Sequence, residues 1–118
     1  MKASHWQTPI FAGWKRDLDL KDVRFSNSVL SVHVEQESNR SWILQFSSVQ
    51  AWKVTAEECA DNVLQNLPES GSLFIVDESP WIRQLGECSA LQGSKHFVIC
   101  CYDEVLEVLA REGVVSAA

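Results

Sequence analysis

The chain has 118 residues, of which 46% are hydrophobic, and its formal net charge is -6. This length predicts one domain spanning 1–118, and the hydrophobic content suffices for a buried core, which argues against a disordered chain. No apolar run approaches the roughly 20 residues of a membrane span, and no signal-peptide core opens the chain, so we expect a cytoplasmic protein. In a reducing cytosol, the four cysteines are expected to be free thiols.

The charge is unevenly distributed. Residues 54–94 contain Arg83 as their single cation and seven acidic side chains. A surface of this sign repels phosphate groups, so nucleic acid is not an expected partner. The excess of acid suits either solubility or the binding of a basic protein.

Residues 1–21 are expected to form an irregular arm rich in aromatic side chains. Trp6, Phe11 and Trp14 occur there around Pro9, without a helical or strand period. These aromatics either pack on the body of the domain or form a homodimer contact through Trp6 and Trp14, because aromatic anchors are enriched in interfaces.

The next segments predict antiparallel strands at 23–25, 29–35 and 42–46. Leu30, Val32 and Val34 alternate with polar residues, which is typical of a half-buried strand. A three-residue hairpin loop with Asn39 in the left-handed conformation would place Trp42 opposite Val34. Residues 49–54 are expected to continue the strand after a bulge.

The segment 55–67 predicts an amphipathic helix. Thr55 and Glu58 match a capping box, and Pro68 follows the end. One stripe is apolar (Ala56, Cys59, Ala60, Val63, Leu64 and Leu67). The other face contains Glu57, Glu58 and Asp61 and no lysine or arginine.

A second short helical element is expected at 80–86. It follows an apolar strand at 73–76 and the pair Asp77 and Glu78. Ser79 is suited to the N-cap, and Pro80 to the first helical position, where its missing N–H is not needed. Trp81 then lies one residue into the helix.

The last elements are a buried strand at 96–102 and an ambiguous segment at 103–110. The ambiguous segment fits either a strand paired with 96–102 or a helix that begins at Asp103, and the hairpin is favoured. The tail is expected to fray. Together the elements predict an α+β fold with a mainly antiparallel sheet of five or six strands, one amphipathic helix (55–67) and a short helical turn (80–86).

Three segments resemble a group of small, acidic, uncharacterised bacterial proteins. They are the run IVDESPWI at 75–82, HFVI at 96–99 and VLEVLA at 105–110. The group has a V-x-D-S-x-W-L segment, an H-[FY]-x-I strand and an E-V-L-A ending. The resemblance implies a bacterial cytosolic domain and favours a strand at the end, and it assigns no activity. Small acidic domains of this size are also similar to immunity proteins by analogy.

The sequence offers little metal or catalytic chemistry. His96 and Cys100 would stand about 13 Å apart on one face of a strand, too far for a shared zinc ion, so no metal and no cofactor are expected. Cys88 with His96 is a candidate nucleophile and base, although Glu87 raises rather than lowers the pKa of a neighbouring thiol. The paired carboxylates of Asp77 and Glu78 at a strand end are a further catalytic candidate, and the alternative is a turn that places negative charge near the start of a short helix.

We therefore expect a non-enzymatic protein-binding module, of immunity or accessory type, that uses an acidic face. The expected partner-binding residues are acidic side chains and one aromatic anchor (Glu57, Glu58, Asp61, Asp77, Glu78 and Trp81). The alternative is a small enzyme or ligand-binding domain with a pocket near Cys88, His96 and Asp77.

Overall fold

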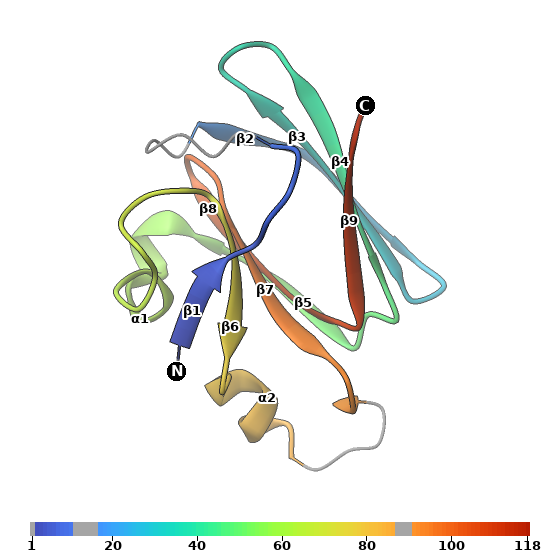
Figure 1. Cartoon of the computed structure of the whole chain (residues 1–118), viewed down its shortest axis with the longest axis vertical. Coiled ribbons are helices and arrows are strands. Elements are labelled where there is room, and N and C mark those ends of the chain that lie inside the picture. The colour runs from blue at the N-terminus through green and yellow to red at the C-terminus, as the bar shows by residue number, and fades with distance from the viewer. Residues whose placement is uncertain (1, 11–16, 87–90) are drawn as a thin grey trace.

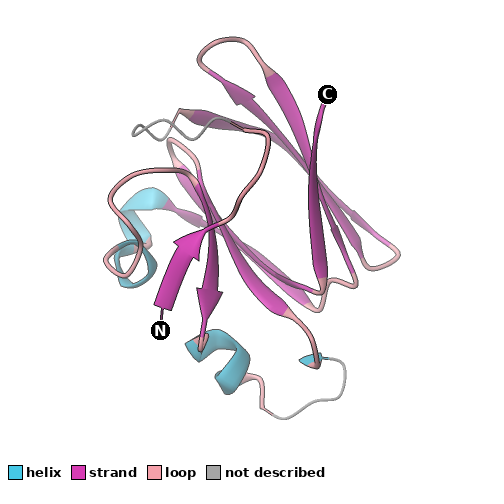
Figure 2. Ribbon diagram, viewed as in Figure 1, coloured by secondary structure: helices cyan, strands magenta, loops and turns pink. Residues whose placement is uncertain are grey.

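The computed structural model describes residues 2–10, 17–86 and 91–118. Within these residues, nine strands form two antiparallel sheets, and two short helices lie outside them (Figures 1 and 2). One sheet has the order β1-β6-β7-β8-β5, and the other has the order β2-β3-β4-β9. The five-stranded sheet consists of β1 (Lys2–His5), β6 (Leu73–Asp77), β7 (Lys95–Cys100), β8 (Glu104–Ala110) and β5 (Ala51–Ala56). The four-stranded sheet consists of β2 (Leu18–Ser26), β3 (Val29–Gln36), β4 (Ser41–Ser47) and β9 (Glu112–Ala117).

The antiparallel sheet prediction is confirmed in kind, but the number of strands and sheets is wrong. Two strands come from segments expected to be irregular. Lys2–His5 pairs with β6, and Glu112–Ala117 pairs with β4, each at the edge of a sheet. Neither segment has a clear apolar alternation, because an edge strand is held mainly by backbone hydrogen bonds to its single neighbour.

The hairpin between β3 and β4 is confirmed. Val34 lies opposite Trp42, and Asn39 has a φ of 63°. The inward side chains of β3 and β4 are buried, while most of the alternate ones are partly or fully exposed. A shift of one residue would turn the whole apolar set to solvent, so burial fixes this register.

The main core lies between the two sheets. It joins the inward side chains of β3 and β4 to those of β7 and β8, including Phe46, Phe97 and Leu106. Strands β7 and β8 are buried on their second face as well. Burial on both faces explains why 96–101 and 105–110 read as nearly continuous apolar runs and not as alternating patterns. The strand alternative for 103–110 is therefore confirmed.

The long helix at 55–67 is wrong. Residues Glu57–Cys59 form one 3₁₀ turn, and α1 covers only Asp61–Leu64. Thr55 belongs to β5 and pairs with Val105, and the backbone N–H of Glu57 donates to the carbonyl of Asp103 at 2.8 Å. These backbone groups are used by the neighbouring strand, so the expected capping box does not form and Cys59 is exposed.

The later part of the apolar stripe, from Ala60 to Leu67, still packs on the outer face of the five-stranded sheet, whereas Ala56 and Cys59 are exposed. Ala60 and Leu67 are buried there against Phe74, Val98 and Cys100. Two short turns thus cover this part of the sheet in place of one helix (Figure 2). No helix in the described part of the chain is long and apolar enough to cross a bilayer.

The second helical element is confirmed as α2 (Pro80–Gln84). Ser79 is its N-cap and accepts a hydrogen bond from the backbone N–H of Ile82, with Pro80 at the first position. Figure 1 shows α2 at the end of β6, where the chain leaves the sheet.

Trp6 packs in the interior. Its ring lies 5.7 Å from that of Phe46 and 4.8 Å from that of Phe97, and these two rings lie 5.1 Å apart. A Cβ on Gly113 would come within 3.0 Å of Trp6 and of Phe46, so glycine admits this close packing. Trp14 and Phe11 lie outside the described residues. The ring of Trp6 is thus largely used within the domain, and the homodimer through Trp6 and Trp14 stays a prediction.

Candidate functional site

Three buried polar side chains form a hydrogen-bonded chain beside α2. Ser79 precedes the helix, His96 is on β7 and Glu107 is on β8, and they are 4%, 3% and 3% exposed. Ser79 Oγ lies 2.7 Å from His96 Nδ1, and His96 Nε2 lies 2.9 Å from Glu107 Oε1. Buried polar groups need hydrogen-bond partners, and these two hydrogen bonds supply partners for all three side chains.

The donor and acceptor roles in this hydrogen-bonded chain depend on the tautomer of His96. With a neutral His96 and a Glu107 carboxylate, which only accepts, the ring hydrogen lies on Nε2. Nδ1 then accepts from the Ser79 hydroxyl. The Ser79 oxygen also accepts from the N–H of Ile82 at 3.2 Å, and this bond fixes the rotation of the serine side chain.

Lys53 and Trp81 lie beside the hydrogen-bonded side chains of His96 and Glu107. Lys53 Nζ lies 3.7 Å from Glu107 Oε2 and 4.2 Å from the centroid of the Trp81 ring. The Trp81 ring meets His96 edge-on, with centroids 5.5 Å apart. Trp81 therefore makes contacts within the domain, and its role as a partner anchor stays a prediction.

A cavity of about 270 Å³ opens beside Ser79. Asp77, Ser94 and Lys95 are among the residues that line it. Ser94 Oγ is buried and has no hydrogen-bond partner among the described residues. The cavity therefore combines a serine that is bonded to histidine with polar and charged groups of both signs.

Acidic side chains gather at one end of the two-sheet body, which we call the acidic end (Asp17, Asp19, Glu57, Asp103 and Glu104). Burial, followed by the charges of Asp103 and Asp19, raises the pKa of Glu104. The neighbouring Tyr102 hydroxyl donates to Glu37, and this hydrogen bond is the main reason that its pKa rises to about 12. The ion pairs found among the described residues involve other carboxylates.

An apolar strip lies where the edge strands β2 and β5 meet, and we call it the seam (Phe25, Trp52 and Val54). These side chains stand on the inward faces, since their cross-strand neighbours Leu30, Val108 and Leu106 belong to the core. They nevertheless remain 49%, 37% and 42% exposed. The rings of Phe25 and Trp52 lie 6.2 Å apart. The core is therefore open to solvent along this edge.

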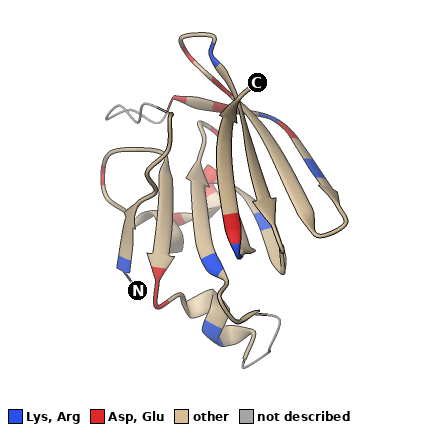
Figure 3. Ribbon diagram, turned by 45° about the vertical axis from the view of Figure 1, so that its right-hand side comes forward, with Lys and Arg blue, Asp and Glu red and all other residues tan. Residues whose placement is uncertain are grey.

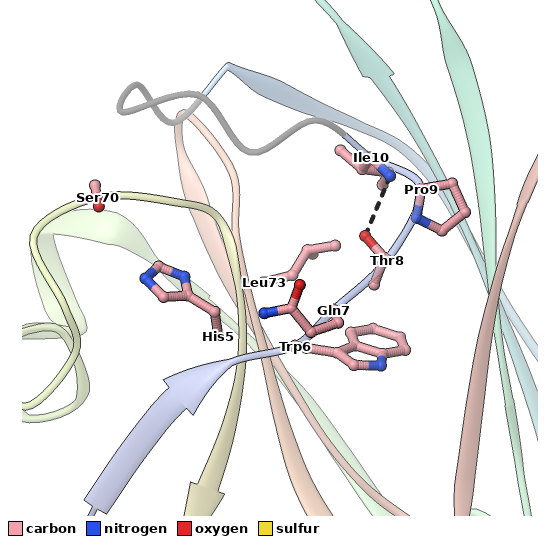
Figure 4. Close-up of a pocket in the computed structure, with 8 residues that line it drawn as sticks. All are labelled: His5, Trp6, Gln7, Thr8, Pro9, Ile10, Ser70 and Leu73. Atoms are coloured by element: carbon pink, nitrogen blue, oxygen red, sulfur yellow. Dashed lines mark hydrogen bonds between the residues drawn. The ribbon is translucent and has the colours of Figure 1, made fainter.

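A second cavity, of about 440 Å³, lies beside the N-terminal strand (Figure 4). Trp6 and Leu73 supply apolar surface, and His5, Gln7 and Ser70 supply polar groups. Gly71, with a φ of 92°, lies against the His5 ring. The chain continues from Ile10 into residues 11–16, which lie outside the described part, so this cavity carries no functional assignment.

The predicted acidic face is divided between opposite ends of the five-stranded sheet. Glu57, Glu58 and Asp61 follow β5 at the end where Ala56 lies opposite Glu104. Asp77 and Glu78 follow β6 at the other end, separated by the length of β8, about 20 Å at 3.3 Å per residue. Figure 3 shows that lysine and arginine accompany the acids at this second end. The structure thus brings Asp77 close to Ser79 and not to Glu57.

The structure describes two of the three residues predicted for an enzyme-type pocket, His96 and Asp77. His96 is buried and bonded to Ser79, and Asp77 lines the neighbouring cavity. Cys88 lies outside the described residues. The sequence did not predict a role for Glu107 or the contact of Ser79 with His96. A carboxylate in the middle of the apolar run VLEVLA was the available signal, since an acid in a doubly buried strand needs a buried partner.

The described cysteines should differ strongly in reactivity. Cys59 is exposed, whereas Cys100 and Cys101 are buried, and burial raises the pKa of Cys101 to about 12. The thiolate is the reactive form, so iodoacetamide at pH 8 should modify Cys59 first and leave Cys101 unmodified until the protein unfolds. Peptide mapping by mass spectrometry measures this order. Equal rates at Cys59 and Cys101 in the folded protein would contradict the burial of Cys101.

No family model matches the chain, and neither a curated protein nor a solved structure does. The resemblance to small acidic bacterial proteins stays a prediction.

Proposed function

We propose that this protein is a protein-binding domain for a basic partner, and that the partner contacts the seam and the acidic end together. The exposure of Phe25, Trp52 and Val54 on faces that elsewhere form the core carries this proposal. Large apolar side chains that gather in one exposed strip are typical of interaction surfaces.

The two surfaces are joined by β5. Trp52 and Val54 lie on this strand, and Glu57 follows it directly, about 17 Å from Trp52 along an extended chain. A partner segment of moderate length therefore spans both. Its apolar side chain would cover the seam, and its lysine or arginine side chains would approach the carboxylates of the acidic end.

The charges favour a basic partner over other occupants. Carboxylates that already repel one another, such as Glu104 and Asp103, gain from a cation that approaches them. The exposed ring of Tyr102 adds an aromatic contact at the same end. Apolar anchors would supply most of the affinity, and the acids would supply association rate and selectivity.

The test compares partner capture by the wild-type protein with capture by two variants. Trp52→Ser with Phe25→Ser removes the seam anchors, and Glu57→Lys with Glu58→Lys and Asp61→Lys reverses the charge beside β5. We expect each variant to weaken binding of a basic partner at least about 30-fold, equivalent to about 2 kcal/mol. Affinity for the wild-type protein should also fall as salt rises.

Two variants elsewhere on the surface serve as matched controls. Val114→Ser removes a side chain that is 62% exposed on β9, and Glu112→Lys reverses an exposed charge on the same strand. Both should bind as the wild-type protein does. A partner that binds all five proteins equally would exclude this surface, and a concentration-dependent dimer lost in the seam variant would identify a second copy of the chain as the occupant.

The alternative, a small enzyme or ligand-binding domain, has separate support at the other end of the molecule. The cavity beside Ser79 is lined by Asp77 and adjoins the residue that bonds to His96. A thermal-shift screen of small polar compounds tests it. Stabilisation that Ser94→Ala or Lys95→Ala removes would support a ligand in this cavity.

A further inference from the structure

We propose that Ser79 is an activated nucleophile that cleaves short-chain carboxylic esters, with His96 as its general base and Glu107 as the group that orients the base. The proposal concerns the opposite end of the five-stranded sheet from the acidic end. It goes beyond partner binding, and its failure would leave the seam and acidic-end proposal unchanged.

The hydrogen bonds that join Ser79, His96 and Glu107 have the geometry of a catalytic triad. A serine becomes a useful nucleophile when an adjacent base takes its proton and a third group orients the base. Here the Ser79 hydroxyl lies 2.7 Å from His96 Nδ1, and the second ring nitrogen lies 2.9 Å from the Glu107 carboxylate. This is the serine–histidine–acid arrangement with the two ring nitrogens exchanged, and it is recognised by roles and geometry rather than by sequence order.

Burial and two neighbouring side chains hold His96 and Glu107 in place. The side chains of His96 and Glu107 are each 4% exposed, and the Trp81 ring covers His96 from the side. Lys53 Nζ, 3.7 Å from Glu107 Oε2, balances the carboxylate charge. A base held in this way has one orientation, with its lone pair at Nδ1 directed toward Ser79.

A cavity gives a substrate access to Ser79. Ser79 lines the cavity of about 270 Å³, and the hydrogen bond from Ile82 occupies one of the two lone pairs of its oxygen. The second lone pair is available for attack. This volume lies just below the usual range of ligand cavities, about 300–1,000 Å³, so a short acyl group fits and a long chain does not. Lys95 and Arg83 line the cavity and are the cations available to a developing oxyanion.

The reaction balances with water as the only co-substrate. Ser79 Oγ attacks the carbonyl carbon while its proton passes to His96 Nδ1, and collapse of the tetrahedral intermediate releases the alcohol, which takes that proton. Water then attacks the acyl-serine, giving its proton to Nδ1, and the carboxylic acid leaves as Ser79 Oγ recovers the proton. Each ester and water thus yield one acid and one alcohol.

The test uses a biotinylated alkyl fluorophosphonate, which forms a covalent bond with an activated serine and releases fluoride. The full-length protein should be labelled at Ser79, as located by peptide mapping, and should hydrolyse p-nitrophenyl acetate. His96→Gln should slow labelling at least about 100-fold, since a general base contributes about 10²- to 10⁴-fold.

Two variants separate nucleophile and structural roles. Ser79→Asn keeps a good N-cap for α2 but has no hydroxyl, so it should fold and lose both labelling and hydrolysis. Ser116→Ala removes an exposed serine of β9, in the other sheet and away from the cavity, and should leave both unchanged. The proposal is overturned if the folded wild-type protein is not labelled at Ser79, or if His96→Gln is labelled at the same rate.

Discussion

Replacing Glu107 with alanine should destabilise the domain by about 1–3 kcal/mol, because this change leaves the buried ring N–H of His96 without its hydrogen-bond acceptor. His96 Nε2 would lose its acceptor at a site where both side chains are 4% exposed. Lys53 adds little to this loss, since its side chain is 48% exposed and the pair with Glu107 is screened. Chemical denaturation of the two proteins measures the difference.

Two further variants identify the source of that loss. Glu107→Gln keeps an oxygen acceptor for His96 and should recover all but about 1 kcal/mol, the difference between a charged and a neutral hydrogen bond. Glu112→Ala removes an exposed acid from β9 and should change stability by less than about 0.5 kcal/mol. If Glu107→Ala and Glu112→Ala were equally stable, Glu107 would not be buried in the folded protein.

Replacing Phe97 with alanine should cost about 3–5 kcal/mol, through a cavity in the main core. Phe97 is 1% exposed, and its ring contacts both Trp6 and Phe46. Alanine would remove the centre of this aromatic cluster and leave Trp6, the contact between the N-terminal strand and the core, less constrained. Denaturation curves give the free energy, and the tryptophan fluorescence of the folded protein, to which Trp6 contributes with four other tryptophans, should shift to longer wavelength.

Phe25→Ala makes the same chemical change at a position that is 49% exposed in the seam. It should cost less than about 1 kcal/mol, because little area is lost from the interior. Similar losses in the two variants would mean that the seam is covered in solution. A dependence of the Phe25→Ala effect on protein concentration would then point to a second copy of the chain.

Local patterns in the sequence predicted several elements correctly. The alternation of Leu30, Val32 and Val34 gave the correct face of β3, and Ser79 followed by Pro80 gave the start of α2. The same kind of reasoning failed at 55–67. An apolar stripe with helical spacing was present, but Thr55 pairs with Val105 of β8 as part of a sheet. Pairing with this distant strand is more favourable than the local helix, so local helix propensity did not decide the structure.

For the candidate sites too, the sequence singled out individual residues but not the contacts between them. The sequence singled out Glu57, Asp77 and His96, each for its own residue type and neighbours. It did not show that Glu57 and Asp77 lie at opposite ends of a sheet, or that His96 bonds to Ser79 and to Glu107, because these residues are joined by pairing across β6, β7 and β8.

The sequence by itself therefore determined the mainly antiparallel character of the fold, the hairpin register at Val34 and Trp42, and the cap of α2, since these depend on residues close together in the chain. Only the tertiary structure decided that there are two sheets, that Phe25 and Trp52 remain exposed beside each other, and that Glu107 is buried with His96. These features depend on contacts between residues far apart in sequence. Such contacts are fixed by how the two sheets pack and by which edge strands stay uncovered.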